Sequence, residues 1–73
     1  MRFLRLKEVM VLTALSRSSI YKFMNENRFP KSVSLGDRAV AWVESEVEDW
    51  MHERLSLRDD QPINPVTNPD TNK

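Results

Sequence analysis

The residues best suited to contact a ligand lie on one side of a short predicted helix that follows Ser16. The Ser16 hydroxyl can accept from free backbone N–H groups of the first turn, so Ser16 is predicted as the N-cap. Ile20, Phe23 and Met24 follow at i, i+3, i+4 and indicate a face that packs on a core. The other face carries cations, hydroxyls and an amide but no carboxylate: Arg17, Ser18, Tyr21, Lys22 and Asn25. It could bind phosphate oxygens and base edges without repulsion, although a solvated amphipathic helix shows the same pattern.

The charge of the chain is unevenly distributed although its formal net charge is zero. Residues 1–43 hold eight Lys/Arg and three Asp/Glu, a balance of +5, whereas residues 44–60 hold two Arg and seven Asp/Glu, a balance of −5. A basic face is what contact with phosphate requires. The segregation therefore favours a nucleic-acid partner for the first part of the chain.

Composition argues against several other classes of protein. The 73 residues allow one domain with a small core, and no cysteine is present to form a disulfide or a thiolate metal site. No apolar run approaches the roughly 18 residues of a membrane span, so we expect a cytoplasmic protein with no membrane contact. With one histidine, His52, and one glycine, Gly36, neither a metal site nor a glycine-rich phosphate loop is indicated. We expect no enzyme activity and no cofactor.

The segment before Ser16 completes a helix-turn-helix pattern. Residues 1–6 predict a short strand or an extended lead-in, residues 7–14 a helix of about two turns, and residues 13–16 the turn. An ordinary helical hairpin would show the same signals. The second helix should end between Asn25 and Asn27, because Asn tolerates the left-handed conformation and Pro30 blocks continuation. Phe29 is predicted to join the core.

Residues 31–43 predict a β-hairpin. Residues 31–35 alternate polar and apolar side chains, Gly36-Asp37 is a plausible two-residue turn, and residues 38–43 return as a second strand. A strict two-residue turn would pair Leu35 with Arg38 and mix the two faces, which a longer turn would relieve. In both versions Arg38 lies at or beside the tip, and Trp42 anchors the hairpin to the helices.

A third, acidic helix follows the hairpin. Ser45 and Glu48 match a capping box, and the helix should run to about Leu57. A predicted apolar stripe comprises Val47, Trp50, Met51 and Leu55. The acidic side is interpreted as solvated and turned away from DNA. Residues 1–58 are thus expected to form the domain, and residues 59–73, with three prolines and three asparagines, a disordered tail.

These elements predict a mainly α fold with a small hairpin: a winged helix-turn-helix of three helices and a two-stranded wing. At the residue level the chain resembles the AlpA family of prophage and genomic-island regulatory proteins, which have a MerR-like, excisionase-like winged architecture. The resemblance is carried by residues 5–9, 15–21, 29–31 and 35–42, then Glu46, Val47 and Trp50. The chain departs from the family at Ala14, where glycine is frequent.

The resemblance implies a sequence-specific DNA-binding regulator of a prophage or integrative element. It would activate transcription of an integrase gene, act as an excisionase (a recombination directionality factor), or do both. Double-stranded DNA is the expected partner, with the second helix in the major groove and the wing at phosphate or the minor groove. Cooperative self-association on DNA and an integrase are further candidate partners. The candidate contacts are Arg17, Ser18, Ser19, Tyr21, Lys22, Asn25, Lys31 and Arg38. The alternative is an adaptor that recruits a protein through the acidic third helix.

Overall fold

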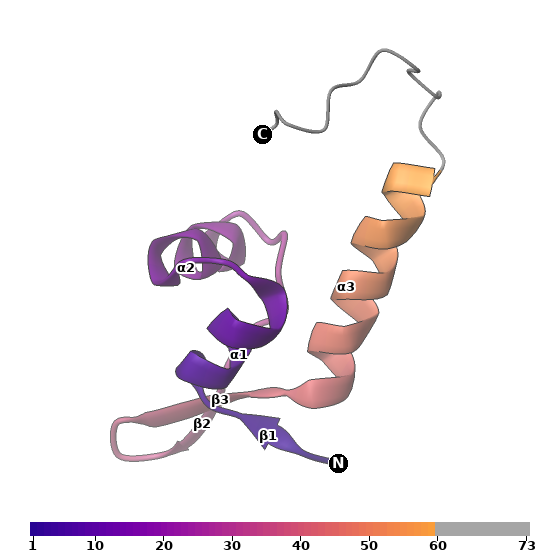
Figure 1. The fold of residues 1–73 in the computed structure, drawn as a ribbon. Helices are drawn as coiled ribbons and strands as arrows, with labels where there is room; N and C mark the ends of the chain where they lie inside the picture. The colour runs from indigo at the N-terminus through magenta and orange to yellow at the C-terminus, as the bar shows by residue number, and fades with distance from the viewer. Residues whose placement is uncertain (60–73) are drawn as a thin grey trace.

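The computed structural model describes residues 1–59 as three helices and a small antiparallel sheet (Figure 1). In chain order the elements are β1 (Phe3–Leu4), α1 (Leu6–Thr13), α2 (Arg17–Asn25), β2 (Val33–Gly36), β3 (Ala39–Val43) and α3 (Glu44–Asp59). This arrangement confirms the predicted fold class, a winged helix-turn-helix. Helix α3 includes Asp59, the first residue of the segment predicted as a tail, and the rest of that prediction lies outside the described residues.

Local capping interactions define the ends of the two helices of the helix-turn-helix. The backbone N–H of Arg5 donates to Glu8 Oε1 at 2.9 Å, which satisfies a polar group at the start of α1. Ala14 ends α1 in the left-handed conformation, at φ 63° and ψ 16°. The predicted N-cap of α2 is confirmed, because Ser16 Oγ accepts from the Ser19 N–H at 3.2 Å. After α2, Asn27 takes φ 59°, as predicted for the end of this helix.

The sheet has the strand order β1-β3-β2, with β3 in the centre. Phe3 pairs with Val43, and Leu4 pairs with Trp42. The first residues therefore form a strand, which was one of the two conformations predicted for them. This third strand gives the wing a wider base than the two-stranded hairpin predicted from the sequence, and it joins the hairpin to the N-terminus.

The turn of the hairpin is one residue later than predicted. Gly36 pairs with Ala39, so the loop residues are Asp37 and Arg38 and not Gly36-Asp37. The register shifts between Ser34 and Gly36, which leaves Leu35 as the extra residue of a bulge. Gly36 at φ 110° and Asp37 at φ 45° both have positive φ. This bulge resolves the conflict of faces that a strict turn at Gly36-Asp37 would have produced.

The core lies where the sheet meets all three helices. Its buried side chains are Leu4, Val9, Ile20, Phe29, Trp42 and Val47. Trp42 is fully buried, and its indole Nε1 donates to the carbonyl of Pro30 at 3.1 Å. The predicted roles of Phe29 as a core residue and of Trp42 as the anchor of the hairpin are thereby confirmed.

Helix α3 ends within two residues of the predicted position but differs from its prediction in its N-cap and in its apolar stripe. It begins at Glu44 directly after β3, so Ser45 lies inside the first turn and is not the N-cap. The Glu44 N–H donates instead to the carbonyl of Arg2 at 2.8 Å, so the residue before β1 supplies an acceptor for the first backbone N–H of the helix. At the other end Leu55 is 47% exposed and does not continue the buried stripe. Figure 1 shows that the C-terminal turns of α3 extend past the sheet and α1.

Candidate nucleic-acid interface

The predicted contact face of α2 is exposed and carries no carboxylate. The side chains of Arg17, Ser18, Lys22 and Asn25 are exposed, and Tyr21 is 39% exposed. The first turn of α2 has no acidic residue, so the partial positive charge of the helix N-terminus is not neutralised there. This end of α2 is therefore electrostatically suited to an anion.

Tyr21 is the residue of this face that is tied to the core. Its ring lies 6.3 Å from the Trp42 ring, centroid to centroid, in an edge arrangement with an interplanar angle of 69°. The Arg17 guanidinium carbon lies 5.7 Å from the Tyr21 centroid, which is within cation–π range. Arg17, Tyr21 and Trp42 thus form a continuous series from the surface of α2 to the centre of the sheet.

Ser19 is placed differently from the other candidates on α2. Its side chain is half-buried, and its hydroxyl oxygen accepts a hydrogen bond from Ser16 Oγ at 3.0 Å. Because the Ser19 N–H also donates to Ser16, the two serines form one capping arrangement. Ser18, which precedes it, is exposed beside Arg17. The structure thus brings Ser18, but not the Ser19 side chain, fully onto the open face.

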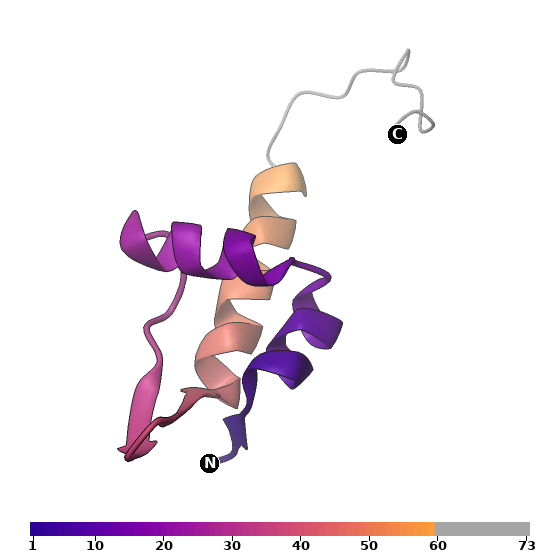
Figure 2. The same ribbon diagram turned by 90° about the vertical axis from the view of Figure 1, so that its left-hand side faces the viewer.

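The wing carries the other exposed candidate, Arg38. This residue is the second of the two loop residues and is exposed. Helix α2 and the β2–β3 hairpin both lie on the side of the molecule opposite α3, and Figure 2 views the molecule from that side. Within residues 1–59, Arg17, Lys22 and Arg38 form no ion pair. Their charges are therefore available to an external anion.

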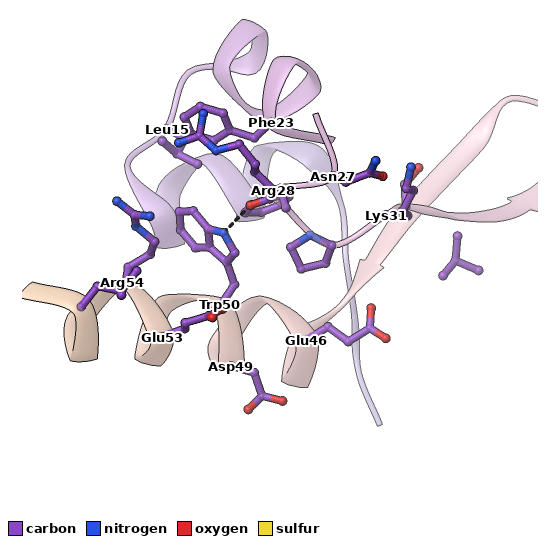
Figure 3. Close-up of a pocket in the computed structure, with 15 residues that line it drawn as sticks. Leu15, Phe23, Asn27, Arg28, Lys31, Glu46, Asp49, Trp50, Glu53 and Arg54 are labelled. Atoms are coloured by element: carbon purple, nitrogen blue, oxygen red, sulfur yellow. Dashed lines mark hydrogen bonds between the residues drawn. The ribbon is translucent and has the colours of Figure 1, made fainter. Parts of the chain in front are cut away.

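Lys31 is the candidate that the structure separates from this group. It belongs to the connection between α2 and β2 and lines a groove between that connection and α3 (Figure 3). The groove has a volume of about 1110 Å³ and an aromatic floor. Trp50 crosses it, with its indole Nε1 donating to the carbonyl of Arg28 at 2.7 Å. Sequence reasoning missed this groove; the available signal was three closely spaced apolar residues, Phe29, Pro30 and Val33, in the α2–β2 connection and β2.

Comparison with known proteins identifies the family. The family model described as "Prophage CP4-57 regulatory protein (AlpA)" matches residues 2–55. A protein of Escherichia coli K12 named "DNA-binding transcriptional activator AlpA" is 36% identical over 62 residues, which cover 77% of this chain and 89% of that protein. The chain belongs to the AlpA family.

A second relative is more similar but longer. The "Uncharacterized protein ORF88" of enterobacteria phage P4 is 53% identical over 57 residues, which cover 78% of this AlpA-family chain. The match spans 65% of the phage protein, slightly under two thirds of its length. The resemblance to the AlpA family stated from the sequence is confirmed, and its match covers all of α1, α2 and the hairpin.

The described part of this AlpA-family chain lacks both a membrane-spanning helix and a metal-binding cluster. No helix within residues 1–59 is long and apolar enough to cross a membrane. In the same part of the chain, no three His, Cys, Asp or Glu side chains gather in a way that could hold a metal ion.

Proposed function

We propose that this protein binds double-stranded DNA through α2 and the wing and regulates genes of a prophage or integrative element. The observation that carries the proposal is the position of α2 and of the loop end of the β2–β3 hairpin on one side of the molecule, opposite the acidic α3 (Figures 1 and 2). Exposed candidate side chains belong to both of these elements, with Arg38 in the loop. A recognition helix in the major groove with a wing beside it needs this arrangement. Family membership and the printed name of the E. coli relative support it.

In the proposed complex the α2 side chains have different tasks. Arg17 lies in the first turn, where side chains of a recognition helix reach base edges or flanking phosphates. Ser18, Tyr21 and Asn25 supply hydroxyl and amide groups that can bond to either. Lys22 and the wing residue Arg38 contact phosphate, with the narrow minor groove as a further target for Arg38. Ser19 supports the helix N-terminus, and Lys31 is a peripheral phosphate contact.

The salt dependence of DNA binding tests this proposal directly. Fluorescence anisotropy with a labelled duplex should show that the logarithm of the association constant falls linearly with the logarithm of salt concentration, because phosphate contacts release condensed counterions. Arg17→Ala should weaken binding to the preferred site by about 1–3 kcal/mol if Arg17 forms a bidentate guanine contact. Absence of DNA binding at every salt concentration would contradict the proposal and favour the adaptor role, in which the acidic α3 recruits a protein.

Two regulatory roles fit the same DNA-binding module. In one, the protein activates transcription of an integrase gene; in the other, it acts as an excisionase at an attachment site, with an integrase and further copies of itself as partners on the DNA. Chromatin immunoprecipitation followed by sequencing distinguishes them. Binding at an integrase promoter supports the first role, binding at an attachment site supports the second, and binding at both supports a combined role.

A further inference from the structure

The C-terminal half of α3 carries an exposed leucine next to an open aromatic groove. Leu57 is 46% exposed and lines the groove that Trp50 crosses (Figure 3). Trp50 and Leu57 are seven residues apart, which places them on the same side of an α-helix. Phe23 forms part of the facing wall, with the Arg28 guanidinium over its ring at 4.8 Å. An exposed aliphatic side chain and an aromatic groove thus share one surface.

The charges along this side of α3 are segregated by position. The carboxylates that line the groove, Glu46, Asp49 and Glu53, come first, and Arg54 and Arg58 follow. The Arg58 side chain is 72% exposed, and within residues 1–59 it pairs only with its exposed neighbour Asp59, at 3.0 Å. An exposed ion pair of this kind contributes little to stability, so Arg58 can exchange partners readily. The helix surface is therefore acidic at one end and basic at the other.

From these observations we propose that α3 pairs with α3 of a second copy of this chain, in antiparallel orientation and across this groove. A two-fold axis beside α3, between Glu53 and Arg54, makes the surface complementary to itself. It brings Leu57 of each copy opposite Trp50 of the other. The same axis brings Glu53 opposite Arg54 and Asp49 opposite Arg58. Each of these contacts occurs twice, as an isologous interface requires.

The proposed dimer leaves the contact face of α2 and the wing residue Arg38 free, and of the proposed DNA contacts it covers the peripheral one, Lys31. Phe23 lines the groove, whereas Tyr21 lies on the contact face of α2. Residues two positions apart on an α-helix point about 200° apart, so these two side chains have nearly opposite directions. The dimer therefore does not depend on DNA binding, and failure of either proposal leaves the other standing. It is also distinct from cooperativity that appears only on DNA.

Sedimentation velocity of the full chain without DNA tests the dimer. The mass should rise with protein concentration from that of one chain to that of two. Leu57→Glu should abolish this rise, because it places carboxylates beside the aromatic floor and the acidic residues. Leu55→Glu is the matched control. Leu55 is 47% exposed on the same helix but does not line the groove, so the Leu55→Glu variant should still form the dimer. A single-chain mass at all concentrations, or a dimer that survives Leu57→Glu, would overturn the proposal.

A charge exchange tests the antiparallel register independently of folding. Asp49→Arg alone and Arg58→Asp alone each place like charges opposite one another twice, so each variant should self-associate at least about tenfold more weakly. Mixed together, they should form a heterodimer, because both charge pairs then become attractive. Heterodimer formation also shows that both variants are folded. If the mixture associates no better than its components, the proposed register is wrong.

Discussion

The ring of Tyr21 on the exposed face of α2 packs edge-on against the fully buried ring of Trp42, with their centroids 6.3 Å apart. The candidate DNA-contacting surface is thus connected to the core through one aromatic pair. Trp42 is in turn fixed by the hydrogen bond from its Nε1 to the Pro30 carbonyl. Tyr21 therefore presents its hydroxyl from a restricted position, which lowers the entropy lost when that hydroxyl binds a ligand.

Substitution of Tyr21 should separate binding from stability. Tyr21→Phe keeps the edge contact with Trp42 and removes only the hydroxyl, so DNA affinity should fall by about 1 kcal/mol with the free energy of unfolding unchanged. Tyr21→Ala also removes the aromatic pair and, unlike Tyr21→Phe, should lower the free energy of unfolding, by ~0.5–1.5 kcal/mol. Anisotropy titrations and urea unfolding measure the two effects. Wild-type DNA affinity in Tyr21→Phe would show that the hydroxyl does not face DNA.

The turn of the helix-turn-helix contains a strained residue. Ala14 is exposed and has φ 63°, a conformation that costs an L-residue roughly 1–2 kcal/mol and costs glycine little. Ala14→Gly should raise the free energy of unfolding by about 0.5–1 kcal/mol after the greater entropy loss of glycine. Gly36→Ala is the converse control: Gly36 has φ 110° with no atom within 4 Å of an added Cβ, so its loss of stability would report backbone strain alone. Thermal unfolding that shows Ala14→Gly to be neutral or destabilising would contradict this account.

The features predictable from the sequence are those determined by neighbouring residues. Ser16 caps α2 through an N–H three residues away, and Asn27 ends that helix by its own left-handed conformation. The start of α3 was mispredicted because its acceptor, the carbonyl of Arg2, is 42 residues distant from Glu44 in the chain. Similarly, the exposure of Leu55 depends on where the sheet and α1 end. The spacing of apolar residues within α3 gives no information about those positions.

The difference between local and long-range determinants also explains which parts of the candidate site could be predicted. The exposed face of α2 follows from helical periodicity, because Ser18, Lys22 and Asn25 are on the side opposite Ile20, with Arg17 and Tyr21 at the margin of that face. Ser19 and Lys31 were selected for chemical type alone. In the structure the Ser19 hydroxyl is engaged in the N-cap of α2, and the Lys31 side chain lies at the groove beside α3. In the wing, Gly36 and Asp37 both tolerate positive φ, so residue type could not distinguish a turn at Gly36-Asp37 from the bulged form with Asp37 and Arg38 in the loop.

Trp42 should be the largest single contributor to stability among the aromatic side chains. Trp42→Ala removes a fully buried ring, the Tyr21 contact and the hydrogen bond to Pro30, and should destabilise the protein by about 3–5 kcal/mol. Trp50 is only half-buried, so Trp50→Phe should cost far less. Urea unfolding in the Trp50→Phe background gives the comparison and isolates Trp42 fluorescence. Emission from Trp42 that an aqueous quencher fully reaches in the folded protein would contradict its burial.

Lys22 should act through the phosphate backbone. It is exposed near the end of α2 and has no ion pair within residues 1–59, so it can neutralise one phosphate. Lys22→Ala should weaken binding to all sequences similarly and reduce the salt slope of binding by about one unit. Lys7→Ala, at an exposed lysine of α1 that is outside the proposed contact set, is the control and should leave the slope unchanged. An unaltered slope in Lys22→Ala would remove Lys22 from the interface.

Arg38 provides the sharpest test of the wing. It is exposed in the loop beside Asp37 and forms no ion pair in the part of the chain that the structure describes, so its removal breaks no ion pair there. Arg38→Ala should therefore weaken DNA binding while the melting temperature of the free protein stays the same. A guanidinium in the minor groove gains most where that groove is narrow, as in A·T-rich tracts, because the negative potential is concentrated there.

The flanking sequence then distinguishes the two targets proposed for Arg38. If it enters the minor groove, Arg38→Ala should lose more affinity on a site with A·T-rich flanks than on the same site with G·C-rich flanks. Equal losses on both duplexes would identify a phosphate contact. Anisotropy titrations of both duplexes at one salt concentration, with the melting temperature of each protein measured in parallel, give the answer. Unchanged affinity on both, or a lowered melting temperature that accounts for the loss, would show that the wing arginine serves the fold and not the interface.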